Sequence, residues 1–141
     1  MKHKRIIAVV LMVVLSLSLC TVAFATAPEN DTITPRYSDI ASISANLTLS
    51  NASTGQLKCT GSATSNRATD TVKLTAKLQR YNNGIWTTIK TWTANGSGYA
   101  LISKYYSVVS GYTYRLQVTT NVYSSSGTYL ESATVSSTYY Y

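Results

Sequence analysis

Residues 72–79 read Val72-Lys73-Leu74-Thr75-Ala76-Lys77-Leu78-Gln79, in which an apolar residue alternates with a polar one at every step. Because successive side chains of a strand point to opposite faces, this pattern predicts a β-strand with one buried and one solvated face. The run is followed by Asn82-Asn83-Gly84, residue types that adopt the positive φ angles of a tight turn. Together the two features predict a hairpin from this strand into residues 85–93.

The same alternation recurs on both sides of this hairpin. It predicts strands with one inward face at 43–49, 57–63 and 112–118, and further strands at 99–109 and 128–137. In 99–109 the apolar residues fall on both parities, so the sequence does not assign an inward face there. Antiparallel strands that each keep one face wet must bury their apolar faces against each other. The sequence therefore predicts an all-β fold, a single seven-stranded antiparallel β-sandwich.

The N-terminus has the pattern of a secretion signal. A cationic cluster, Met1-Lys2-His3-Lys4-Arg5, precedes twenty uncharged and mostly apolar residues that end in Val22-Ala23-Phe24-Ala25. Small residues at the third-last and last positions are typical of a signal peptidase site, so we expect cleavage before Thr26 and a secreted product. The alternatives are an uncleaved membrane anchor and a lipidated Cys20. Apart from this segment before cleavage, no contact with a membrane is expected.

The predicted domain boundaries follow from this cleavage. Removal of the signal peptide, residues 1–25, leaves 116 residues, enough for one compact domain. Residues 26–37 contain two prolines and no periodicity and are expected to form a flexible leader. The β-sandwich domain is expected over 38–138, followed by a tyrosine tail at 139–141, which either frays or contacts a partner.

The charge of the exported part disfavours nucleic acid as a partner. This part holds nine Lys or Arg residues and five Asp or Glu residues, a net charge of +4. No two of the nine cations are adjacent, whereas proteins that follow a phosphate backbone cluster their cations.

The exported part also carries little chemistry for catalysis. It has no His and one Cys, Cys59, which lies in the alternating run 57–61 and is therefore expected to be a buried small hydrophobe. The alternative is a thiol for intermolecular pairing or nucleophilic attack, but no histidine is present to activate a nucleophile. A glycosidase-like pair would require two of Asp39, Asp70 and Glu131 to meet in a cleft. We interpret the two Asp as turn residues and Glu131 as a solvated strand position. No metal site, no cofactor and no enzymatic activity are expected.

Twelve Tyr and two Trp are the unusual feature of the composition. On a regular strand Trp86 and Trp92 would share a face about 20 Å apart. Tyr105 and Tyr106 are adjacent, so one ring must leave the core. These four residues are the candidate ligand contacts, although core packing is a competing interpretation. Exposed rings and a mild positive charge favour a cell-envelope polymer or a glycan as partner. Self-association into an extracellular matrix or coat is the alternative.

The segment Gly111-Tyr112-Thr113-Tyr114-Arg115-Leu116-Gln117-Val118 resembles the tyrosine-containing sixth strand of immunoglobulin-like and fibronectin type III sandwiches. The resemblance implies a structural role for Tyr114, with Tyr112 as the alternative: the hydroxyl would bond the preceding connection as a tyrosine corner. A true immunoglobulin domain has a disulfide between its second and sixth strands. Here Cys59 lies on the second strand but Leu116 occupies the expected partner position, so no such bond is expected.

The exported region as a whole resembles a family of small secreted proteins of unknown function from Gram-positive bacteria. The resemblance is carried by residues 78–86, which lead into Trp92 and then Tyr114. That family brings no assigned activity and no catalytic residues. The resemblance therefore implies an exported sandwich and leaves its ligand open.

Overall fold

The described part of the chain is built entirely from strands. The computed structural model describes residues 36–141, which form seven antiparallel strands in two sheets and contain no helix. This confirms the predicted all-β class and the number of strands. Residues 1–35, and with them the predicted signal sequence and most of the predicted leader, lie outside the described residues.

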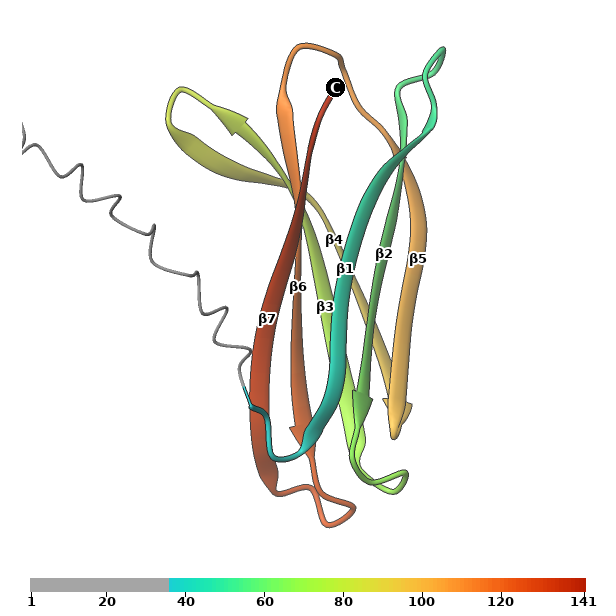
Figure 1. Ribbon diagram of the computed structural model, residues 1–141, viewed down its shortest axis with the longest axis vertical. Helices are drawn as coiled ribbons and strands as arrows, with labels where there is room; N and C mark the ends of the chain where they lie inside the picture. The colour runs from blue at the N-terminus through green and yellow to red at the C-terminus, as the bar shows by residue number, and fades with distance from the viewer. Residues whose placement is uncertain (1–35) are drawn as a thin grey trace, which may run out of the picture. The chain divides into compact units, whose positions relative to one another are not determined.

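The two sheets combine strands that are distant in sequence. In chain order the strands are β1 (Ile40–Asn51), β2 (Gln56–Ser65), β3 (Thr71–Asn82), β4 (Ile85–Ser97), β5 (Tyr99–Ser107), β6 (Thr113–Tyr123) and β7 (Tyr129–Tyr140). The three-stranded sheet has the order β1-β2-β5 and the four-stranded sheet the order β4-β3-β6-β7. All neighbouring strands are antiparallel (Figure 1).

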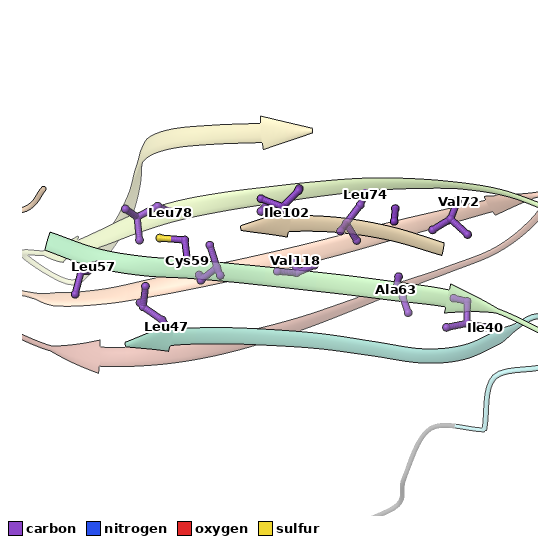
Figure 2. Close-up of a cluster of buried hydrophobic side chains, with 14 of the residues drawn as sticks. Ile40, Leu47, Leu57, Cys59, Ala63, Val72, Leu74, Leu78, Ile102 and Val118 are labelled. Carbon is purple, nitrogen blue, oxygen red and sulfur yellow. The ribbon is translucent and has the colours of Figure 1, made fainter. Parts of the chain in front are cut away.

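The core lies between the two sheets and is formed by alternate residues (Figure 2). The inward faces predicted for β2 and β3 are confirmed, and on β6 the alternation continues as far as Val122. Burial of a Val or Leu side chain contributes about 1.5–3 kcal/mol, so this cluster is the main source of stability. The hydrophobic residues with no exposed surface are Leu57, Cys59, Ala63, Val72, Ala76, Leu78, Leu116, Val118 and Val122.

Gly61, in the middle of β2, lies where the two sheets approach closely. A Cβ atom added to it would lie 2.8 Å from Cγ2 of Val118 on β6. Carbon atoms attract best at about 3.5–4.0 Å, so a larger residue would push the sheets apart. This contact explains a glycine in a strand interior, where the residue otherwise weakens the sheet.

The predicted hairpin between β3 and β4 is present. Asn82 pairs with Ile85, so the loop consists of Asn83 and Gly84, whose φ angles are 49° and 82°. Positive φ at both loop positions defines the tight turn whose twist matches that of antiparallel strands. In Figure 1 this yellow-green hairpin projects sideways near the end of the sandwich that carries the C-terminus.

The structure assigns the face of β5 that the sequence left open. Ala100 and Ile102 point into the core, whereas Tyr99, Leu101 and Tyr105 lie on the opposite, exposed face. Apolar residues therefore occupy both parities of β5. β5 is also an edge strand, because only β2 pairs with it.

The C-terminal tyrosines belong to the sheet. Tyr140 pairs with Thr113, and the backbone of Tyr141 exchanges hydrogen bonds with that of Tyr112. The hydroxyl of Tyr141 donates to the carbonyl of Ala52 at 2.7 Å. The interpretation of residues 139–141 as a frayed tail is therefore wrong, since the chain before β6 offers backbone partners up to the last residue.

Glu131, near the start of β7, binds the backbone at the start of β1 through hydrogen bonds. Its carboxylate accepts hydrogen bonds from the backbone N–H groups of Asp39 at 2.9 Å, Ile40 at 3.0 Å and Ser38 at 3.3 Å. These bonds lower the pKa of Glu131 below its ordinary value of 4.5, and the bond from Asp39 has the largest effect. The interpretation of Glu131 as a solvated strand position is therefore wrong, because its partner is the backbone of another strand.

We predict that Glu131→Gln lowers the free energy of unfolding at neutral pH by roughly 1 kcal/mol, because an uncharged amide accepts these bonds less strongly. The folded-state pKa of Glu131 is depressed, so its charge stabilises the fold above the unfolded-state pKa. This contribution is lost as the pH falls through the lower folded-state pKa. Urea unfolding of both proteins from neutral pH to about pH 3 should therefore show a difference that shrinks on acidification. A difference that stays constant with pH would contradict this role.

Candidate functional site

Most aromatic side chains gather at one end of the sandwich, which we call the aromatic end. It is the end where β3, β5 and β7 finish and where β4 and β6 begin, near the C-terminus in Figure 1. The strand register brings these segments together although they are far apart in the sequence. Nine of the fourteen Tyr and Trp residues lie there: Tyr81, Trp86, Tyr105, Tyr106, Tyr112, Tyr114, Tyr139, Tyr140 and Tyr141.

A β-bulge separates the two tryptophans of β4. Leu78 pairs with Lys90 but Gln79 pairs with Thr88, so Ile89 is the extra residue. One extra residue exchanges the faces of all side chains that follow it. The expectation that Trp86 and Trp92 share a face is therefore wrong, because it assumed a regular strand.

Trp92 and Tyr106 pack against each other between the two sheets. Their ring centroids are 6.2 Å apart at an interplanar angle of 77°, an edge-to-face contact, and both rings lie against the core. Tyr105 points away from them on the outer face of the three-stranded sheet. Trp86 lies on the outer face of the four-stranded sheet. The structure therefore does not bring the four candidate ligand contacts together at one site.

Trp86 belongs instead to a cluster that orients an arginine, the Trp86–Arg115 cluster, formed by Tyr81, Trp86, Gln79 and Arg115. The guanidinium carbon of Arg115 lies 4.2 Å from the centroid of the Trp86 ring, and the Tyr81 ring packs on Trp86 at 5.0 Å. Arg115 also donates from Nε at 2.9 Å and from Nη2 at 2.7 Å to Oε1 of Gln79. Gln79 is only 8% exposed although it lies on the outer face. Its carbonyl oxygen is thus a fixed acceptor.

This arrangement leaves part of the guanidinium open to a ligand. Gln79 uses two of the five N–H donors that a guanidinium offers, so the others remain available for an anionic group. The stacking on Trp86 reduces the freedom that Arg115 would lose on binding. The cluster can therefore bind a carboxylate, a phosphate or a sulfate oxygen.

The Asp and Glu side chains of the described residues lie at the opposite end, in what we call the acidic corner: Asp39, Asp70 and Glu131. Asp39 pairs with Arg67 at 3.6 Å, and buried Asp70 accepts a hydrogen bond from the Ser65 hydroxyl at 2.6 Å. The structure does bring the three acids to one corner, as a glycosidase-like pair would require. Each acid, however, accepts or pairs within the fold, and the lowered pKa of Glu131 is unlike that of a general acid.

Cys59 is fully buried on the inner face of β2. Burial raises the pKa of its thiol from 9.0 to about 11, so the thiolate is scarce at neutral pH. A nucleophilic role would need the opposite shift. Within residues 36–141, no three His, Cys, Asp or Glu residues are grouped so as to hold a metal ion.

Comparisons of the chain with protein-family models, with curated proteins and with solved structures found no match. The resemblance to small secreted proteins of Gram-positive bacteria therefore stays a prediction. In the part of the chain that the structure describes, no helix is long and apolar enough to cross a membrane.

Sequence reasoning did not single out Arg115, Gln79 and Tyr81. The alternation shows that all three point outward, but it does not show that Gln79 lies opposite Arg115, because β3 and β6 are separated by two other strands. The available signal was the aromatic pair Tyr81 and Trp86 on either side of the predicted turn. Residues that flank a two-residue turn face each other across the hairpin.

Tyr114, at the start of β6, is 1% exposed, and its hydroxyl donates to the carbonyl of Val109 at 2.6 Å. Burial raises the pKa of Tyr114, and the Arg80 charge and the Val109 bond only partly oppose this effect. The bond spans the connection from β5 to β6, five residues back along the chain. This is the contact that a tyrosine corner makes.

We predict that Tyr114→Phe lowers the free energy of unfolding by about 1 kcal/mol, because the carbonyl of Val109 loses its partner. Tyr112→Phe is the matched control, since it removes a hydroxyl two residues away and keeps the ring. Thermal or urea unfolding of the three proteins measures the difference. Equal stability of Tyr114→Phe and the unmodified protein would show that the bond does not hold the connection.

Proposed function

We propose that this chain is a secreted, non-enzymatic binding module that attaches to an anionic, carbohydrate-containing polymer of the cell envelope. The binding surface is the outer face of the four-stranded sheet, centred on the Trp86–Arg115 cluster. The observation that carries this proposal is a guanidinium held by stacking and by two hydrogen bonds, with donors left over and no carboxylate beside it. Such a group suits an anion on a polymer better than it suits catalysis.

Three aromatic side chains and one threonine near Arg115 form a row across the sheet. The register places Trp86, Tyr81, Thr113 and Tyr140 next to each other on four successive strands. With strands about 4.8 Å apart, the row is about 14 Å long. Tyr81 is 43% exposed and Tyr140 is 70% exposed. Rings exposed in this way offer apolar area and hydroxyl groups to a chain of sugar rings.

The charge of this face supports an anionic partner. The outward residues of β3 and β6 include Lys73, Lys77 and Arg115, and the rest are Thr, Asn, Gln and Tyr. No Asp or Glu among residues 36–141 lies on this face, since all three belong to the acidic corner. A surface of one sign attracts a polyanion and holds it less well as salt is added.

We extend the proposal to the fold type and to export. A fibronectin type III-like or immunoglobulin-like sandwich is supported by three strands facing four, in the orders given above, and by the bond from Tyr114 to Val109. Export is supported by the cationic and apolar pattern of residues 1–25. A non-enzymatic role is supported by the hydrogen bonds and the ion pair that engage Asp39, Asp70 and Glu131 within the fold.

Retention on purified cell wall tests the proposal. We predict that the protein without residues 1–25 binds wall material at low salt and is released as NaCl is raised. Arg115→Gln should weaken retention about tenfold, because a charge-assisted bond is worth about 1.5–3 kcal/mol. The matched control is Lys58→Gln, which removes one charge from the outer face of the other sheet and should bind normally. No retention at low salt, or equal losses in both variants, would contradict the proposal.

A second candidate function, self-assembly into a matrix or coat, is favoured by the edge strand β5. Its outer face carries Tyr99, Leu101 and Tyr105, which are 48%, 49% and 53% exposed. Its pairing with β2 has no bulge, and its other edge has no strand partner within the described chain. Edge strands pair with other chains unless a charge or a bulge prevents it, and the single charged residue of β5 is the exposed Lys104.

Sedimentation velocity over a range of concentrations tests self-assembly. If β5 pairs with another copy, the protein should sediment as larger species with rising concentration, and Leu101→Lys should remain a monomer. Ile85→Lys is the matched control, because it places the same charge at an exposed apolar residue of the β3–β4 hairpin. A monomer at every concentration would exclude assembly.

A further inference from the structure

A hollow of about 180 Å³ opens on the inner side of the aromatic end, away from the Trp86–Arg115 cluster. Its walls come from β3, from the bulge of β4 and from the connection that follows β5. The residues that line it include Arg80, Ile89, Tyr106, Ser107, Val108 and Val109. The bulge at Ile89 and the bond between Tyr114 and Val109 shape two of these walls.

The guanidinium of Arg80 is the polar group of this hollow that lacks a partner. Its central carbon lies 4.7 Å from the centroid of the Tyr112 ring, a cation–π contact. Its Nε atom is buried and has no hydrogen-bond acceptor. Arg80 has no ion pair with any described residue. The one ion pair within the described range, 36–141, joins Arg67 to Asp39. A buried donor without an acceptor is unfavourable, and an entering acceptor would remove that penalty.

The other walls restrict what such an acceptor can be. Ile89, Val108 and Val109 are apolar, and Tyr106 and Ser107 each carry a hydroxyl. The hydroxyl of Tyr114 already donates to Val109, so it has no hydrogen left for an anion. The one guanidinium matches a single negative charge, and its planar fork matches a carboxylate.

We propose that this hollow binds the carboxylate of a small apolar acid, carried either by a free molecule or by the C-terminus of a peptide with an apolar last residue. The carboxylate pairs with Arg80 after a small movement of the guanidinium, and the apolar group lies against Ile89, Val108 and Val109. This site is separate from the polymer-binding face, because Arg80 and Arg115 point to opposite sides of the four-stranded sheet.

Titration of the ¹⁵N-labelled protein with N-acetylphenylalanine, followed by amide chemical shifts, tests the site. We expect saturable shifts at Ile89, Ser107 and Val108, and binding at least tenfold weaker for N-acetylphenylalanine amide, which has the same apolar group without the charge. This comparison needs no variant. Equal binding of acid and amide, or no shift at these residues, would overturn the proposal, and so would tighter binding of inorganic phosphate.

Variants assign the binding to Arg80. Arg80→Gln should weaken binding of the acid at least tenfold, and Arg80→Lys should restore only part of it, because an ammonium group lacks the planar fork. Arg115→Gln is the matched control and should bind the acid normally while its retention on cell wall weakens about tenfold. Unchanged binding in a folded Arg80→Gln protein would overturn the assignment. A tripeptide that ends in Phe, with a free or an amidated C-terminus, then distinguishes the two sources of the carboxylate.

Discussion

Burial of alternate side chains between two sheets is the interaction on which the rest of this structure depends. Residues 36–141 contain one cysteine, which is free, and one ion pair, in which the side chain of Arg67 is exposed to solvent. The hydrophobic core must therefore hold the fold. Its thickness is limited where Gly61 meets Val118, and this close approach fixes the position of β2 over β6. The core fixes the positions of the strands, and the strands in turn position the residues outside it, including both candidate sites.

The antiparallel order of the strands separates two chemistries. The end where β1 and β7 begin holds the three described carboxylates, and each of them is engaged by a backbone N–H, a hydroxyl or an arginine. The opposite end holds most of the aromatic rings together with Arg80 and Arg115, and each guanidinium is stacked on a ring. The three acidic side chains thus stabilise one end of the fold, and the cationic and aromatic surface at the other end has no Asp or Glu side chain among residues 36–141. We consider this separation to be the basis of the proposed binding function.

Local patterns allowed prediction of the strands but not of their partners. The alternation in 72–79 and the Asn83-Gly84 turn depend only on neighbouring residues, so β3, its inward face and the following hairpin were predictable. The bulge at Ile89 has no such signal, and it moved Trp86 to a different face from Trp92. The roles of Glu131 and Gln79 could not be predicted either, because they depend on contacts with segments that are distant in sequence.

The most direct test of this account is to map a soluble anionic wall polymer onto the ¹⁵N-labelled protein by chemical shifts. The account predicts that the largest shifts occur at Tyr81, Trp86 and Arg115, and that residues of the acidic corner shift little. Shifts centred on the acidic corner, or spread along β5, would contradict the claim that the cationic Trp86–Arg115 side of the aromatic end determines where this protein binds.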